Sequence, residues 1–180
     1  MESPINQLHP EEARWFAIRT KFKHEKQAAK WLISNEVEVY LPLQKLVRRY
    51  TRKVKTVELP LISGYLFVKI TKAEYLTVLK TSGVVGFIRI AKQLIAIPEA
   101  EIKLMQRVVG ETDGSAEVSP ISLANGDAVE IIGGQLTGVR GKLLDCSNDK
   151  NFLVELTHIG FELRMQIPSE LLRRCAKSFA

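Results

Sequence analysis

Hydrophobic positions in the first 110 residues follow two different periods. Alternation every second residue predicts strands, and apolar residues three or four apart predict helices. The expected strands are Trp15–Arg19, Val37–Val47, Val54–Leu59, Tyr65–Ile70 and an extended pair, Val84–Ile90 with Gln93–Ile97. The expected helices are His24–Asn35, which buries Ala28, Trp31 and Leu32, then Ala73–Lys80, and a last helix opened by Pro98 with Leu104, Met105 and Val108 on its apolar face. This mixture predicts a small α+β sandwich with an antiparallel sheet.

After residue 120 the pattern changes to short strands alone. The expected strands are Asp127–Ile132, Lys142–Cys146, Phe152–Leu156 and Phe161–Ile167, with turn residues between them. So few short strands predict a small β-barrel, which protects the edges of the sheet.

Between the two patterns lies a segment almost without large apolar side chains. Residues 110–120 are rich in Gly, Ser, Pro and acidic residues, a composition typical of a flexible linker. The sequence therefore predicts two domains, at 14–109 and 121–176.

Composition narrows the class of protein. With 46% hydrophobic and 26% charged residues, the chain can form a core, which excludes a disordered chain. No apolar run approaches the roughly 18–20 residues of a membrane span, and no apolar run follows a basic start as in a secretory signal. Cys146 and Cys175 form no CxxC pair. These features predict a cytoplasmic protein in a reducing compartment, with no membrane partner.

The charge is concentrated in one part of the chain. Residues 1–110 hold 19 lysines and arginines against 10 acidic residues, whereas residues 111–180 hold 7 against 10. The segment Arg14–Lys55 alone carries 12 basic and 3 acidic residues. Such a local excess favours a polyanionic partner, nucleic acid before a membrane surface, although a merely solvated face has the same composition.

No constellation of residues points to catalysis. His9, His24 and His158 are far apart and lack metal-ligand spacing. The Gly141–Lys142 pair fails as a phosphate-binding loop because Leu occupies positions 136 and 143. We therefore expect a binding protein that is not an enzyme, with no cofactor and no metal.

The basic residues are instead arranged for phosphate contacts. Lys23, Lys26 and Lys30 are three and four residues apart, so they share one helix face. The nucleic-acid candidates are Lys21, Lys23, Lys26, Lys30, Arg48, Arg49, Arg52 and Lys53, with Gln27, Asn35 or Tyr50 beside them for base contacts.

Two motifs resemble one known family. Pro60–Val68, preceded by Trp15–Ile18 and followed by Gly83–Arg89, resembles the N-terminal (NGN) domain of NusG-type transcription factors. Gly126–Ile131 with Gly134, Gly138 and Gly141 resembles the KOW module that follows it in that family. The resemblance spans about Arg14 to Arg174, in the family's order. It is closer to specialised paralogues such as RfaH and the UpxY antiterminators than to housekeeping NusG.

The resemblance implies a factor that rides on RNA polymerase and suppresses pausing and termination. It implies that an apolar pocket grips the clamp helices of the largest subunit, through Trp15, Ile62, Tyr65, Phe67 and Phe87. The chain has Ile62–Ser63 where the family often has Phe-Pro, which makes the pocket rim smaller. From the strand alternation, Tyr65 and Leu66 point to opposite faces.

The resemblance also implies contacts with nucleic acid and with a further protein. The non-template single-stranded DNA is one expected partner, and the base-reading helix positions of RfaH fall on Trp31, Ser34 and Asn35. Ile159, expected on the surface at a turn tip, matches the position where a KOW module meets a small-subunit ribosomal protein; Rho is the other expected KOW partner. The alternative interpretation is a KOW-containing ribosome- or RNA-binding protein that does not act on polymerase.

Overall fold

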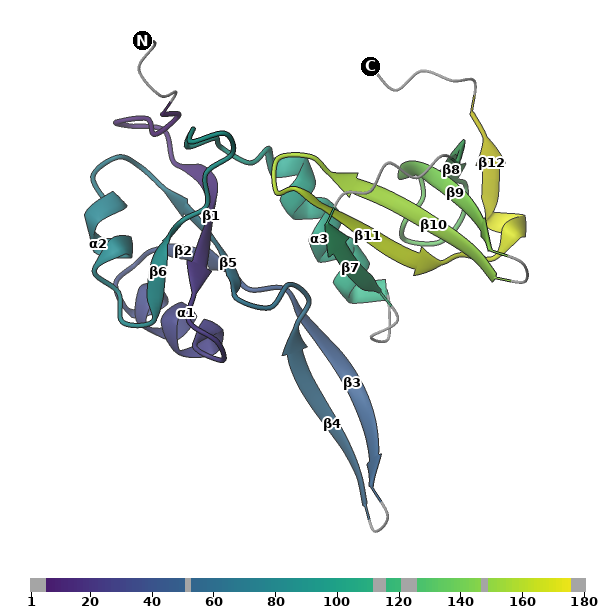
Figure 1. The fold of residues 1–180 in the computed structure, drawn as a ribbon, viewed down its shortest axis with the longest axis horizontal. Helices are drawn as coiled ribbons and strands as arrows, with labels where there is room; N and C mark the ends of the chain where they lie inside the picture. Colours follow the sequence, from purple (N-terminus) through teal and green to yellow (C-terminus); the bar gives the residue numbers. More distant parts are fainter. Residues whose placement is uncertain (1–5, 51–52, 112–115, 121–125, 147–148, 176–180) are drawn as a thin grey trace. The chain divides into compact units, whose positions relative to one another are not determined.

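The computed structural model describes residues 6–50, 53–111, 116–120, 126–146 and 149–175. Two compact units are found, Met1–Leu43 with Ile62–Lys103, and Gln44–Leu61 with Leu104–Ala180. The first unit is built on a four-stranded antiparallel sheet in the order β2-β5-β1-β6 (Figure 1). Its elements are β1 (Arg14–Thr20), α1 (Glu25–Ser34), β2 (Glu38–Tyr40), β5 (Tyr65–Ile70), α2 (Tyr75–Leu79), β6 (Val84–Phe87) and the first turn of α3 (Glu99–Glu111).

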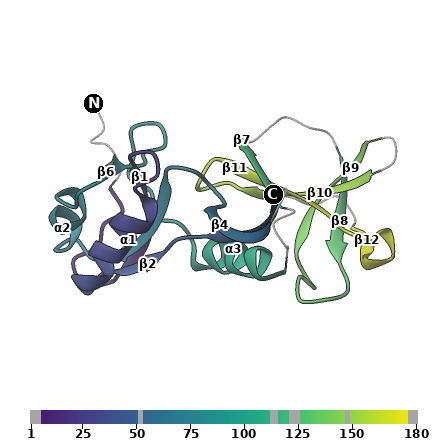
Figure 2. The same ribbon diagram turned by 90° about the horizontal axis from the view of Figure 1, so that it is seen from below.

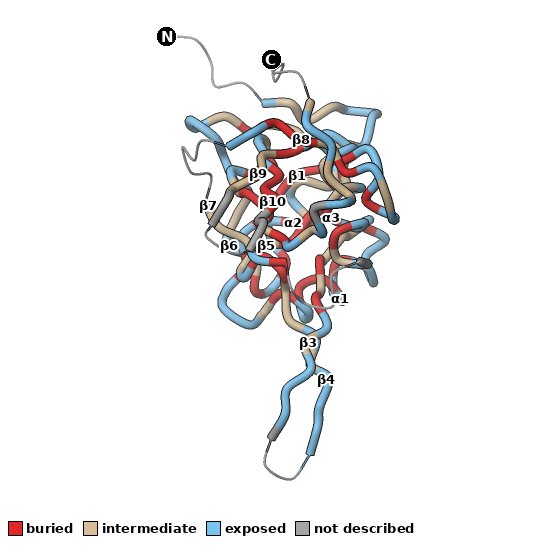
Figure 3. The backbone as a smooth tube through the Cα atoms, turned by 90° about the vertical axis from the view of Figure 1, so that its right-hand side faces the viewer, coloured by how far each residue is buried: buried red, intermediate tan, exposed pale blue. Residues whose placement is uncertain are grey.

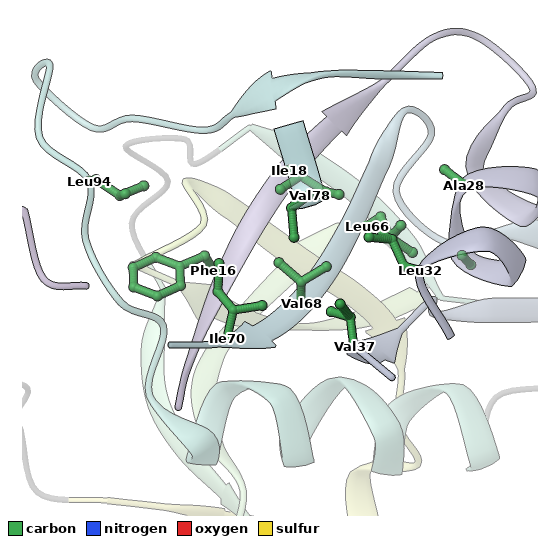
Figure 4. Packing of buried hydrophobic residues seen from close by; sticks show 11 residues of the cluster. Phe16, Ile18, Ala28, Leu32, Val37, Leu66, Val68, Ile70, Val78 and Leu94 are labelled. Atoms are coloured by element: carbon green, nitrogen blue, oxygen red, sulfur yellow. The ribbon is translucent and has the colours of Figure 1, made fainter. Parts of the chain in front are cut away.

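One face of this sheet forms the core of the first unit. The alternate residues Phe16 and Ile18 of β1 lie opposite Val68 and Leu66 of β5. Figure 4 shows these side chains packed together with residues of α1 and α2, such as Leu32 and Val78. α1 lies beside β2 and β5. Its place next to β2 is also visible in Figure 2. The predicted α+β class and antiparallel sheet are confirmed.

Two local predictions for the first unit need correction. Trp31 was expected in the core, but its side chain is 40% exposed. The buried side of α1 is formed by Glu25, Ala28, Ala29 and Leu32 instead. Residues 93–97 were expected to pair as a strand with 84–90; they make only isolated bridges, such as Ile90 with Gln93.

The second unit contains a hairpin and a six-stranded antiparallel sheet. The hairpin pairs β3 (Leu43–Tyr50) with β4 (Lys53–Pro60), and it is exposed along most of its length in Figure 3. The sheet runs in the order β12-β8-β9-β10-β11-β7. Its strands are β7 (Glu117–Pro120), β8 (Asp127–Ile131), β9 (Arg140–Cys146), β10 (Asp149–Leu156), β11 (Phe161–Gln166) and, after the 3-10 turn η1 (Ser169–Leu171), β12 (Leu172–Arg174). Because β7 and β12 are not paired with each other among the described residues, closure into a barrel stays a prediction.

The segment predicted as a linker contains regular structure at both ends. α3 continues to Glu111, and β7 pairs with β11 from Glu117 to Pro120. Residues 112–115 lie outside the described residues. The second half of α3 belongs to the second unit, where the Arg107 guanidinium donates to the carbonyl oxygens of Gln135 and Thr137 in the β8–β9 loop.

Gly141 lies in β9 close to the backbone and side chains of the neighbouring strand β10, and we expect Gly141→Ala to destabilise the second unit. An added Cβ would overlap the Leu153 carbonyl oxygen and lie 2.7 Å from the Phe152 ring. Overpacking of this kind costs about 1–3 kcal/mol, or more where backbone must move. Thermal unfolding measures the loss. Gly110→Ala is the control: nothing lies within 4 Å of its added Cβ, so it should not lower the melting temperature.

Candidate functional site

The face of the first sheet opposite the core carries a row of aromatic side chains. Trp15 and Ala17 of β1 lie opposite Lys69 and Phe67 of β5, and Tyr40 of β2 lies on the other side of Phe67. Tyr65 is two residues before Phe67 and therefore shares its face. We call Trp15, Tyr40, Tyr65 and Phe67 the aromatic face. The Tyr40 and Phe67 rings are stacked at 6.2 Å, and burial raises the pKa of Tyr40.

A charged network fixes Trp15 at one end of the aromatic face. The Trp15 indole N–H donates to Glu99 Oε2 at 2.8 Å, from the first turn of α3. Lys69 Nζ lies 3.5 Å from the same oxygen and 5.7 Å from the centre of the Trp15 ring. The hydrogen bond from Trp15, followed by the charges of Lys69 and Lys103, holds the pKa of Glu99 below its ordinary value of 4.5. A shallow pocket of about 330 Å³ borders Trp15 and Glu99, between residues 12–15 and 96–99.

We expect Glu99→Gln to lower stability at neutral pH and to have little effect in acid. A carboxyl whose pKa is lowered by folding stabilises the fold above its unfolded pKa and loses that contribution as the pH falls through its folded pKa. The difference in melting temperature between wild type and Glu99→Gln should therefore shrink below about pH 4.5. A difference that stays constant from pH 7 to pH 3 would contradict the ionic role.

The five residues predicted to grip polymerase do not form one surface. Trp15, Tyr65 and Phe67 share the aromatic face, but Phe87 pairs with Ile18 and lies on the core face. There Phe87 packs edge-on against Phe16 and stacks on Tyr75 at 4.7 Å. A glycine follows Val85, and the pairing of β1 with β6 shifts register. Alternation along the sequence therefore does not predict the face on which Phe87 lies.

Ile62 was expected at the entrance of the pocket, but it is only 3% exposed. It belongs to the turn before β5, where Tyr65 N–H donates to the Ile62 carbonyl. The buried carboxylate of Glu25 accepts the Gly64 N–H at 2.8 Å and ties this turn to α1. Of the aromatic face, Trp15 and Phe67 are buried, whereas Tyr65 and Tyr40 are half-buried. Sequence reasoning missed Tyr40, because nothing local indicates that β2 pairs with a strand beyond the hairpin.

The lysines predicted to contact phosphates all lie at the surface of the first unit. Lys21 and Lys23 are exposed in the turn before α1, and Lys26 and Lys30 are exposed along the helix. We call these four residues the lysine face. Gln27, Ser34 and Asn35 are also exposed. A positive φ of 60° at Lys23 turns the chain into the helix.

The other predicted cations lie on the hairpin of the second unit. Arg48, Arg49 and Lys53 are exposed, while Arg52 lies outside the described residues, as does the side chain of Tyr50. The hairpin and α1 belong to different units.

Ile159 does not lie on the surface as predicted. It is 4% exposed, in the turn between β10 and β11. Its N–H and that of Gly160 both donate to the Leu156 carbonyl, and Gly160 takes a φ of 80°. The isoleucine side chain is therefore buried in this turn, and its role as a partner contact stays a prediction.

Groups suited to catalysis are not gathered anywhere in the described part of the chain. Three or more His, Cys, Asp or Glu side chains placed to hold a metal ion do not occur among these residues. None of the helices in the described ranges is long and apolar enough to span a membrane. What the described residues offer is an aromatic face and clustered cations, which suit binding to macromolecules.

Comparisons with known proteins identify the family of the chain, through a match over its first part. Residues 13–106 match the family model NusG, described as "Transcription termination factor nusG". No curated protein matches the chain. Among solved structures, "Domain interaction in Thermotoga maritima NusG" is 18% identical with a TM-score of 0.56, covering 92% of this chain and 98% of that one. Two conformations of the MjSpt4:Spt5 complex are 21% identical with TM-scores of 0.32, covering 91–92% of this chain and 99% of theirs. At these identities the likeness to the Thermotoga protein shows the fold alone.

Proposed function

This chain belongs to the NusG family of transcription factors, which are not enzymes, and we propose that it binds RNA polymerase during elongation and suppresses pausing and termination. The factor acts by holding polymerase in its elongating form, so it needs a docking surface and no reacting group. Within the family we assign it to the specialised antiterminators of the RfaH and UpxY type.

The half-buried position of Tyr65 on the aromatic face carries the proposal. Its face is opposite the core, so this ring is not needed to pack the sheet against α1 and α2. Trp15 and Phe67 form the rigid floor beside it, and Tyr40 extends the face. A rigid apolar floor with an accessible tyrosine is the arrangement typical of binding hot spots. The clamp helices of the largest polymerase subunit are the proposed partner.

The lysine face supports a second contact, with the non-template single-stranded DNA. Four exposed cations within ten residues can neutralise phosphates without reading bases. Arg48, Arg49 and Lys53 on the hairpin supply a further basic surface. For the second domain, proposed to cover residues 121–176, a ribosomal protein or Rho stays the proposed partner. The turn that holds the buried Ile159 is the proposed contact.

Co-purification with core RNA polymerase tests the function directly. The full chain should bind core polymerase in the absence of ribosomes and should shorten pauses on a template with a known pause site. Binding to ribosomes or RNA without binding to polymerase would favour the alternative, a KOW-containing ribosome- or RNA-binding protein.

A further inference from the structure

Tyr40 on the aromatic face carries a buried hydroxyl that has no hydrogen-bond partner among the described residues. Its ring is stacked on the fully buried ring of Phe67, with 6.2 Å between the ring centres. The neighbours of Tyr40 in the chain, Val39 and Leu41, pack against the core on the other side of the sheet. The position of the Tyr40 hydroxyl is therefore fixed by the fold before any partner binds.

This hydroxyl is a donor that the fold leaves uncommitted. Burying a polar group without a hydrogen bond costs free energy, because the group loses its contacts with water and gains none in exchange. Burial also raises the pKa of Tyr40, so the phenol keeps its proton at neutral pH and remains a donor. A binding partner that brings an acceptor oxygen against this hydroxyl would remove the cost of its burial.

The charged groups at the Trp15 end of the aromatic face already have partners. The Trp15 indole N–H donates to Glu99, and Lys69 Nζ lies 3.5 Å from Glu99 Oε2 and 3.8 Å from Glu38 Oε2. Both carboxylates are thus engaged with groups other than the Tyr40 hydroxyl. Within the aromatic face, Tyr40 is the residue whose polar atom is both buried and unpartnered in the described part of the chain.

We propose that the Tyr40 hydroxyl donates a hydrogen bond to a side-chain acceptor oxygen of the docking partner, and that this bond selects the partner. The inference rests on the proposed function, in which the aromatic face docks on the clamp helices of RNA polymerase. A helix with an apolar side chain at this position would leave the hydroxyl desolvated and unpaired, which lowers its affinity. Tyr65 and Phe67 thus supply the apolar contact, and Tyr40 distinguishes one amphipathic helix from another.

Removing the hydroxyl alone tests the proposal, because Tyr40→Phe keeps the ring that stacks on Phe67. Titration of core RNA polymerase with the full chain should show an affinity about tenfold weaker than that of wild type, the effect of one lost hydrogen bond. The free variant should unfold at the same temperature as wild type or at a higher one, since no hydrogen bond within the described residues is lost.

The same substitution at Tyr75 is the matched control. Tyr75→Phe removes a hydroxyl on the core side of the sheet, where the Arg89 guanidinium donates to it at 3.4 Å, and should leave polymerase binding unchanged. Normal polymerase binding by Tyr40→Phe would overturn the proposal. A melting temperature of Tyr40→Phe well below that of wild type would also overturn it, because the hydroxyl would then be bonded within the free protein.

The titration also keeps this inference distinct from the proposed function. If wild type does not bind core polymerase, the proposed function fails, and the inference fails with it. If wild type binds and Tyr65→Ala weakens binding while Tyr40→Phe does not, only the inference fails. The aromatic face would then be the docking surface, but its hydroxyl would not select the partner.

Discussion

Replacing Lys23, Lys26 and Lys30 together by glutamine is expected to weaken binding to single-stranded DNA about 100-fold at roughly 0.1 M salt. Each lysine that neutralises one phosphate contributes about 0.7 to the slope of log affinity against log salt. Four contacts, with Lys21 included, predict a wild-type slope of about −3. The triple variant should reduce the magnitude of this slope by about 2. Titration of a labelled oligonucleotide at several salt concentrations measures both quantities.

A matched variant shows whether position or net charge matters. Lys72, Lys80 and Lys92 are also exposed and belong to the first unit, but they lie outside the lysine face. Replacing these three by glutamine removes the same total charge and should change the slope by much less than one. Equal slopes for wild type and the Lys23, Lys26 and Lys30 variant would mean that the lysine face is only a solvated surface.

Local sequence patterns predicted helices and strands correctly where the periodicity of apolar residues matches the side of the element that is buried. β5 occupies Tyr65–Ile70 as predicted, and Leu66 and Tyr65 do face opposite sides of the sheet. The first unit's last helix begins after Pro98 with Glu99 in its first turn, again as predicted. These features depend on neighbouring residues, so the sequence contains the information that determines them.

The errors arise where a distant contact decides the outcome. The buried stripe of α1 includes Glu25, because its carboxylate accepts the Gly64 N–H of a turn 39 residues away. With that stripe centred on Glu25, Ala28 and Leu32, Trp31 falls on its edge and becomes exposed. The apolar identity of Trp31 suggested the opposite, since no local signal reveals the partner of Glu25.

In the candidate site, too, local features could be predicted from the sequence, and features that depend on distant contacts could not. The residues of one strand, Tyr65 and Phe67, could be grouped by alternation alone. Phe87 could not, because its face depends on how β6 pairs with β1 across a register shift. Tyr40 joins the aromatic face through the pairing of β2 with β5. Lys69 and Glu99 contact Trp15 at its border, Glu99 from a helix start that is distant in the chain. Sequence reasoning therefore found the centre of the face but not its borders.

The other large effect expected is on polymerase binding, where Tyr65→Ala should weaken the affinity at least about 30-fold. Truncating an aromatic anchor at the centre of an interface costs about 2 kcal/mol or more. Tyr65 is half-buried on the aromatic face, beside the buried ring of Phe67, so its ring is accessible yet held in place. The loss should be nearly independent of salt, because the contact is mainly apolar. That separates it from the loss caused by the lysine variants. Titration of core polymerase with wild type and variant gives the ratio.

Tyr75→Ala is the matched control for this experiment, because it makes the same truncation on the other face of the sheet. Tyr75 is also half-buried, but it stacks on Phe87 and packs against the core. Tyr75→Ala should therefore lower the melting temperature while the folded protein binds polymerase normally. Tyr65→Ala should do the reverse, and Tyr65→Phe should keep most of the affinity because the ring remains. Normal binding by Tyr65→Ala, together with weakened binding by folded Tyr75→Ala, would move the docking surface to the opposite face of the sheet.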